Sequence, residues 1–144
     1  MPNHCDQTVT FEGPISLILR LHQAVKESNL LQLVRPMPFH ASNWYEWCNT
    51  NWNTKWDICD PLVTDTSWDD ETPAWLLEEK YEDETFKFTF TCWTAWAPPT
   101  PVWEDIQQSG VSVTAEYIDE GGFFQGTFVN GETNEWEPKE EACH

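Results

Sequence analysis

Alternation of apolar and polar residues predicts a set of β-strands. The clearest case is residues 85–93, where Phe86, Phe88 and Phe90 face one way and the residues between them face the other. Runs of similar composition predict further strands over residues 7–12, 55–59, 111–117 and 123–129. A pair of glycines, Gly121-Gly122, separates the last two strands and indicates a hairpin turn.

Apolar residues at helical spacing predict three helices, over residues 14–27, 44–52 and 101–107. A proline in the first turn suits the first and third helices, and N-cap residues precede the second and third. Between the first two helices, Pro36 and Pro38 favour an extended segment over residues 30–38.

Residues 60–84 depart from these patterns. Their apolar residues are grouped rather than periodic, and acidic residues dominate, with Lys80 the only base. We interpret this stretch as an acidic insertion that docks on the body through Trp68 and Trp75, with a short helix after Pro73.

The order of the elements predicts the fold class. With the short helix at 44–52 left aside, strand, helix, strand, strand, helix and strand follow one another, with one more strand at the end, and this order is typical of an α+β protein. We therefore expect a ferredoxin-like two-layer sandwich, in which an antiparallel sheet carries its helices on one face. One domain is expected over residues 1–131, with the acidic insertion at about 60–84, and residues 132–144 form an acidic C-terminal tail.

Charge narrows the possible partners. The chain has 144 residues, and its seven Lys and Arg against 25 Asp and Glu give a net charge of −18. Phosphate repels such a chain, so direct binding to nucleic acid or to an anionic membrane is not expected. Ten Trp, eight Phe and three Tyr distinguish it from disordered acidic tails, which contain few aromatic residues.

The sequence also favours a cytoplasmic location. No stretch has the roughly 20 apolar residues that span a bilayer, and the first residues lack the features of a secretion signal. The five cysteines are scattered and include no C-x-x-C pair, so neither a disulfide framework nor a zinc site is indicated. We expect reduced thiols in a bacterial cytosol.

Several motifs spread over residues 1–129 together resemble a known family. They are Met1-Pro2-Asn3, Gly13-Pro14, Pro36-Met37-Pro38, the block 44–57 (WYEWCNTNWNTKWD), the stretch 94–99 (TAWAPP), Tyr117 and the stretch 121–126 (GGFFQG). They look like the motifs of the YubB-type proteins of phages and plasmids, which carry a ferredoxin-like domain. The resemblance implies that fold and a phage or plasmid setting, and it implies no activity and no catalytic residues. The acidic insertion and the acidic tail are the parts least like the family.

No motif indicates an enzyme, since the chain has no Gly-rich phosphate loop, nucleophile elbow or H-E-x-x-H helix. We expect no catalytic residues, no cofactor and no metal site, because the acids follow no calcium-loop spacing. The Trp-rich block at 44–56 is either an aromatic platform for bases or sugars or part of the folding core. The core is favoured, because a stacked nucleic acid would be repelled by the net charge.

The remaining signal is the charge itself. Ordinary solubility requires a net charge of only about 2 to 8 in a small domain, and acids on one rigid surface can imitate the phosphates of a nucleic acid. The first hypothesis is therefore a non-enzymatic, phage- or plasmid-encoded binding protein that inhibits a bacterial defence protein by occupying its basic nucleic-acid-binding surface. The residues expected to bind the partner are Asp65, Asp69, Asp70, Glu71, Glu78, Glu79, Glu82, Asp83 and Glu84, with Trp68 and Trp75 as anchors.

Two alternatives belong to other classes. One is a domain that binds a small ligand or nucleotide in a Trp-lined pocket around Trp44, Trp47, Trp93 and Trp96. The other is a structural or dimerising element of a mobile genetic system.

Overall fold

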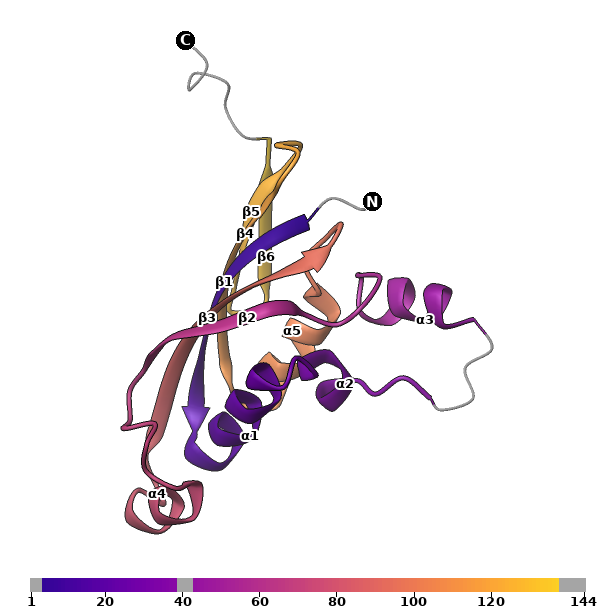
Figure 1. The fold of residues 1–144 in the computed structure, drawn as a ribbon. Helices are drawn as coiled ribbons and strands as arrows, with labels where there is room; N and C mark the ends of the chain where they lie inside the picture. Colours follow the sequence, from indigo (N-terminus) through magenta and orange to yellow (C-terminus); the bar gives the residue numbers. More distant parts are fainter. Residues whose placement is uncertain (1–3, 39–42, 138–144) are drawn as a thin grey trace.

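The computed structural model describes residues 4–38 and 43–137, which form six strands and five helices (Figure 1). The strands are β1 (His4–Pro14), β2 (Cys59–Thr66), β3 (Thr85–Ala95), β4 (Ser112–Asp119), β5 (Gln125–Val129) and β6 (Glu132–Trp136). The helices are α1 (Ile15–Lys26), α2 (Leu30–Val34), α3 (Trp44–Asn51), α4 (Ala74–Lys80) and α5 (Thr100–Gln108).

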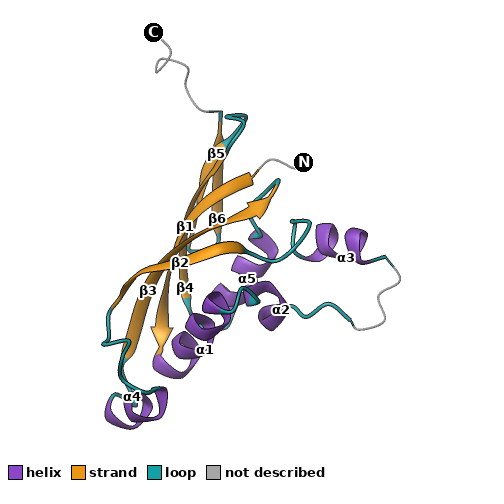
Figure 2. Ribbon diagram, in the orientation of Figure 1, coloured by secondary structure: helices purple, strands orange, loops and turns teal. Residues whose placement is uncertain are grey.

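All six strands belong to one antiparallel sheet in the order β2-β3-β1-β4-β5-β6. Its longest pairing is between β1 and β3, which stay in register from His4 opposite Ala95 to Pro14 opposite Thr85. Strand β4 lies on the other side of β1, and the hairpin of β5 and β6 continues the sheet from there (Figure 2).

The predicted ferredoxin-like two-layer sandwich is wrong. The sheet has six strands because β5 and β6 extend it beyond β4, and helices α3 and α4 lie to the side and at one end of the sheet (Figure 2). Strand β6 takes its residues from the predicted acidic tail. All five of its residues are exposed, so no apolar alternation in the sequence indicated a strand there.

The core lies between one face of the sheet and helices α1, α2 and α5. Along β1 the side chains of Val9 and Phe11 are fully buried, whereas the alternate residues Asp6, Thr8 and Glu12 are exposed on the other face. The Phe11 ring makes edge-to-face contacts with three core rings, those of Phe88, Phe90 and Trp103. Such contacts bury much apolar area and fix the sheet against α5.

Residues 30–34 form the short helix α2, where the sequence predicted an extended segment. The carboxylate of Asp57 caps this helix, because its two oxygens accept the backbone N–H groups of Leu31 and Gln32, each at 3.0 Å. Asp57 lies 26 residues from Leu31 in the chain, so no local sequence signal indicated the cap. Pro36 and Pro38 restrict only the residues next to them.

The predicted strand over 55–59 is also misplaced, since β2 begins at Cys59 and runs to Thr66, inside the predicted insertion. Strand β2 forms an edge of the sheet and has two irregularities in its pairing with β3. Asp60 has a left-handed backbone with φ 48°, and Pro61 follows it. Both features are tolerated at an edge strand, where one side of the backbone needs no partner.

Candidate partner-binding surface

Eight of the nine acidic residues predicted to bind a partner lie between β2 and β3, on or next to the segment that contains α4, at one end of the molecule (Figure 1). The ninth, Asp65, lies on β2 opposite Thr89 of β3. All nine fall within residues 65–84, which we call the acidic lobe. The side chains of all nine are exposed, namely Asp65, Asp69, Asp70, Glu71, Glu78, Glu79, Glu82, Asp83 and Glu84. Lys80 is the only basic residue in the lobe. Over residues 4–38 and 43–137, neither of the two ion pairs involves any of the nine carboxylates.

The acidic lobe is anchored in the core. The ring of Trp68 stacks on that of Phe86, with centroids 5.1 Å apart and planes 8° apart, and Leu77 of α4 is buried. Backbone bonds add to this anchor, because Ser67 N–H donates to the carbonyl of Lys87 at 2.8 Å and Lys87 N–H donates to Ser67 Oγ at 2.9 Å. The carboxylates therefore sit on a structured support, so a partner need not order the lobe on binding.

The two tryptophans predicted as anchors for a partner differ in position. Trp68 is only 9% exposed and is part of the core, so it supports the lobe from within and is not a surface anchor. Trp75 is 67% exposed on α4, beside Leu76, which is also exposed. Of the two tryptophans, only Trp75 offers a partner an exposed ring.

A hollow of about 400 Å³ lies between α4 and the start of β3. Trp68, Leu76 and Tyr81 supply apolar wall, and Asp69 and Glu84 supply carboxylates. Lys80 also lines the hollow, and its Nζ lies 5.4 Å from the centroid of the Tyr81 ring, so a basic side chain of this protein already packs on the aromatic wall.

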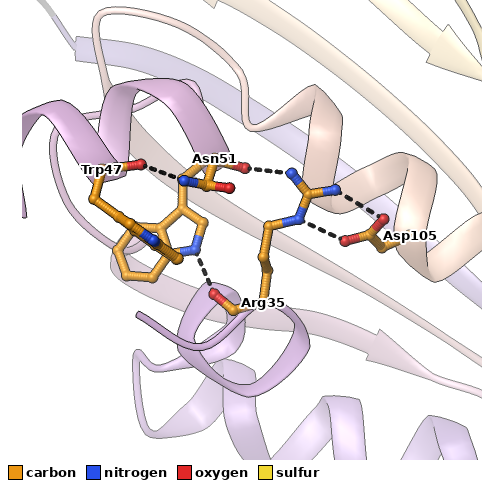
Figure 3. A network of polar contacts seen from close by, with 5 residues as sticks. Arg35, Trp47, Asn51 and Asp105 are labelled. Carbon is orange, nitrogen blue, oxygen red and sulfur yellow. Dashed lines mark hydrogen bonds and ion pairs between the residues drawn. The ribbon is translucent and has the colours of Figure 1, made fainter. Parts of the chain in front are cut away.

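The Trp-rich block is tied into the body by a polar network (Figure 3). The indole Nε1 of Trp52 donates to the carbonyl of Arg35 at 2.8 Å, and Trp52 itself is buried. The Arg35 guanidinium donates to the carbonyl of Asn51 at 3.1 Å, and Asn51 Nδ2 donates to the carbonyl of Trp47 at 3.0 Å. Trp52 and its network therefore serve the packing of α3 against α2 and α5.

Each tryptophan of the alternative ligand pocket packs on another aromatic ring. Trp47 meets the ring of Trp52 edge to face, and Trp44 meets Tyr45. Trp93 lies instead on β3, where its ring stacks on His4 with centroids 3.5 Å apart. Trp96 meets Tyr45 with centroids 5.8 Å apart. Trp47 therefore packs on the buried Trp52, whereas Trp44, Trp93 and Trp96 are linked to one another through Tyr45, Lys55 and Trp56.

Lys55 lies among aromatic rings. Its Nζ is 5.0 Å from the ring centroid of Trp56, 5.8 Å from that of Trp96 and 5.9 Å from that of Tyr45. Trp96 has a left-handed backbone with φ 76°, which is unusual for a large side chain. The cation–π contacts join the turn at residues 52–57 to the start of α3 and to the loop after β3.

The structure also reveals a groove that the sequence analysis missed. It lies on the exposed face of the sheet, and its side walls include Trp93 and Trp136. Asp6 and Glu116 lie between them on β1 and β4. The only signal in the sequence was that these residues occupy the polar positions of strands with alternating polar and apolar residues. The same pattern is typical of any sheet face that is exposed to solvent.

Burial keeps the core thiols and one phenol protonated. It raises the pKa of Cys5 to about 12, with the charges of Asp119 and Asp6 acting in the same direction. Burial likewise raises the pKa of Cys92 and of Tyr117, whose hydroxyl donates to Glu135 Oε2 at 2.8 Å. A nucleophilic cysteine needs the opposite shift, so these thiols are structural.

Two further properties bear on function. Among the described residues, no three His, Cys, Asp or Glu side chains are grouped so that they could hold a metal ion. No helix within residues 4–38 and 43–137 is long and apolar enough to cross a bilayer.

The chain matches no family model, no curated protein and no solved structure.

Proposed function

We propose that this protein is a non-enzymatic binding protein that docks its acidic lobe on the basic, nucleic-acid-binding surface of a bacterial protein and so blocks that surface. The observation that carries the proposal is the grouping of nine exposed carboxylates, none in an ion pair within the described residues, on a lobe anchored by Trp68 and Leu77. The resemblance to phage and plasmid proteins makes a defence protein in the host cytosol the natural target.

The charge of the lobe favours fast and selective encounter with a basic surface. Closely spaced charges of one sign attract an oppositely charged partner over distances near the Debye length, about 8 Å at physiological salt. Complementary charge of this kind raises the association rate and disfavours acidic partners. High salt should therefore slow the association.

Contacts at the lobe itself would supply the affinity. Trp75 is exposed among the carboxylates, and large aromatic side chains are frequent sources of binding energy at interfaces.

The test uses two variants with the same net charge. The lobe variant carries Asp69→Lys, Asp70→Lys, Glu82→Lys and Asp83→Lys. The control variant carries Glu12→Lys, Glu27→Lys, Glu104→Lys and Glu132→Lys, all at exposed positions outside the lobe. Each tagged protein is used to capture partners from a bacterial lysate at about 0.1 M salt and again at about 0.5 M salt.

A captured nucleic-acid-binding protein is then purified and loaded with labelled duplex DNA or RNA. We expect the wild type and the control variant to displace the nucleic acid and the lobe variant to leave it bound. Equal displacement by both variants would mean that net charge alone acts and that the lobe is not the site. Capture of partners that bind no nucleic acid would contradict the proposed mode of inhibition.

A further inference from the structure

The groove on the exposed face of the sheet lies toward the opposite end of the strands from α4, and Asp65, opposite Thr89, is the lobe residue on the strand next to groove residue Thr91. Its central row runs across five strands, because register places Trp136, Gln125, Ile118, Asp6 and Trp93 side by side in that order. This row lies near the His4 end of β1, whereas α4 precedes Thr85, which pairs with Pro14 at the other end. The groove has a volume of about 620 Å³, within the range of small-molecule sites.

Each end of the row carries a tryptophan. Four strand spacings separate β3 from β6, which gives about 19 Å between the backbones that carry Trp93 and Trp136. The groove is therefore long enough for an extended ligand that lies across the strands and touches an aromatic ring at each end.

Trp93 is held in place before any ligand arrives. Its ring stacks on the imidazole of His4 with planes 11° apart, and its Nε1 donates to Asp60 Oδ2 at 2.8 Å. The Trp56 ring meets it edge to face with centroids 6.4 Å apart. A wall fixed in this way loses little conformational freedom when a ligand packs against it.

Charge in the groove has one sign. Asp6, Asp60 and Glu116 contribute carboxylates, and no Lys, Arg or His of the described residues lines the groove. The remaining polar side chains are uncharged acceptors and donors, namely Thr8, Thr91, Gln125 and Thr127. The ligand that complements this groove is a cation.

The spacing of the carboxylates does not favour a single metal ion as that cation. Asp6 and Glu116 lie on neighbouring strands but two residues out of direct opposition, since Asp6 faces Ile118 and Glu116 faces Thr8. Diagonal positions of this kind are about 7–8 Å apart. Asp60 lies beyond Trp93 on β2, and the described residues contain no metal-binding group of three acids.

We infer that this groove binds a linear aliphatic polyammonium ion, a polyamine laid across the strands. Its ammonium groups would lie near Asp6, Glu116 and Asp60, and its methylene chain would pack on Ile118 and on the tryptophan rings. Cation–π attraction adds to the charge pairing at the two aromatic ends. The inference does not depend on the proposed function, which concerns the acidic lobe.

The experiment separates a site in the groove from diffuse attraction to an acidic protein. Binding of a linear tetraamine is measured by titration calorimetry at about 150 mM salt, where weak surface attraction is screened. The groove variant carries Asp6→Asn and Glu116→Gln, and the matched control carries Glu27→Gln and Glu104→Gln, at exposed positions outside both the groove and the lobe. Both remove two charges with little change in shape, so protein charge is equal in the two variants.

We expect the groove variant to bind the tetraamine about tenfold or more weakly and the control to bind within about twofold of the wild type. Trp136→Ala should also weaken tetraamine binding, and Mg²⁺, which has charge but no methylene chain, should bind the wild type far more weakly. Circular dichroism checks that each variant is folded, and the isosteric groove variant keeps the test valid if Trp136→Ala unfolds.

Three results would overturn the inference. Equal weakening in the groove and control variants would show diffuse attraction only. Mg²⁺ binding as tight as tetraamine binding would show that the methylene chain contributes nothing. If a neutral oligosaccharide gave heat of binding in the same experiment and the tetraamine gave none, the aromatic groove would be a sugar site instead.

Discussion

The guanidinium of Arg35 and the carboxylate of Asp105 form a bidentate ion pair, with Nε to Oδ2 at 2.8 Å and NH2 to Oδ1 at 3.0 Å (Figure 3). Arg35 follows the end of α2, and Asp105 lies on α5. Because the same guanidinium also donates to the carbonyl of Asn51 at the end of α3, one side chain joins three helices.

Replacing Arg35 by lysine should destabilise this junction, because a lysine cannot reproduce the two parallel bonds to Asp105 or the third to Asn51. Both side chains of the pair are about one-third exposed, so water offsets part of the loss. We expect Arg35→Lys to lower the free energy of unfolding by about 1 kcal/mol. Urea unfolding followed by tryptophan fluorescence measures the change.

The matched control is Arg20→Lys. Arg20 is exposed on α1 and is in neither ion pair of residues 4–38 and 43–137. We expect this variant to unfold at the urea concentration of the wild type. Equal stability of Arg35→Lys and the wild type would show that the network is not a stabilising junction.

Stability should fall at alkaline pH because of the buried thiols. Burial raises the pKa of Cys5 from 9.0 to about 12, so above about pH 9 the unfolded chain loses this proton while the folded chain keeps it. Deprotonation therefore lowers the free energy of the unfolded state relative to the folded state. Between its unfolded-state and folded-state pKa values, each such group lowers the free energy of unfolding by about 1.4 kcal/mol per pH unit. Cys92 and Tyr117 act in the same direction, since burial raises their pKa values too.

Urea midpoints measured from pH 8 to pH 11 check this dependence. We expect the stability of Cys5→Ala to fall less steeply with pH than that of the wild type, whatever its stability at pH 8. Parallel curves for the two proteins would mean that Cys5 ionises equally in the folded and unfolded states.

The elements with strong local patterns could be predicted, and those fixed by distant contacts could not. The apolar alternation of β3 and the helical spacing of α1 lie in single stretches of sequence, and both elements occur close to where they were predicted. Helix α2 depends on a cap from Asp57, and β6 pairs with β5 although all its residues are exposed. Neither the cap nor the pairing leaves a local signal.

Gly126 is required by the packing between β4 and β6. A β-carbon there would lie 2.6 Å from the hydroxyl oxygen of Tyr117 and 2.5 Å from the carbonyl oxygen of Asn134. Gly126→Ala should therefore push Tyr117 away from Glu135 and loosen the pairing of β6, at a cost of about 1–3 kcal/mol. Hydrogen exchange of the amides at 132–136, measured by mass spectrometry, should become faster.

Thr127→Ala serves as the control, because Thr127 lies next to Gly126 but faces the groove on the other side of the sheet. Its β6 amides should exchange at the wild-type rate. If Gly126→Ala also left their exchange unchanged, the close contact with Tyr117 would not be what positions β6.

The exposure of the nine acidic residues could be predicted from their charge alone, but which of the two tryptophans near them is buried could not. Trp68 and Trp75 both lie in the same acidic stretch, with no periodic pattern to show which is buried. The difference arises because Trp68 stacks on Phe86 of β3, whereas Trp75 lies on the outer side of α4. The groove between Trp93 and Trp136 depends on register across five strands, which the sequence does not reveal.

Truncation of the two tryptophans of the acidic lobe should therefore have a large effect on stability at one position and a small effect at the other. Trp68 is 9% exposed, so Trp68→Ala removes a large core side chain and should lower the free energy of unfolding by about 3–5 kcal/mol. Trp75 is 67% exposed, so Trp75→Ala should change stability by no more than about 0.5 kcal/mol. Urea unfolding of the two variants gives both values.

The effects of the two tryptophans on binding to the captured partner should be in the reverse order when only folded variants are compared. Trp75→Ala should weaken binding although it is fully folded, because it removes the exposed apolar side chain among the carboxylates. Trp68→Phe keeps an aromatic ring against Phe86 and should bind nearly as the wild type does. If Trp75→Ala bound as well as the wild type, the lobe would act through charge alone, and the partner would make no apolar contact with the exposed side of α4.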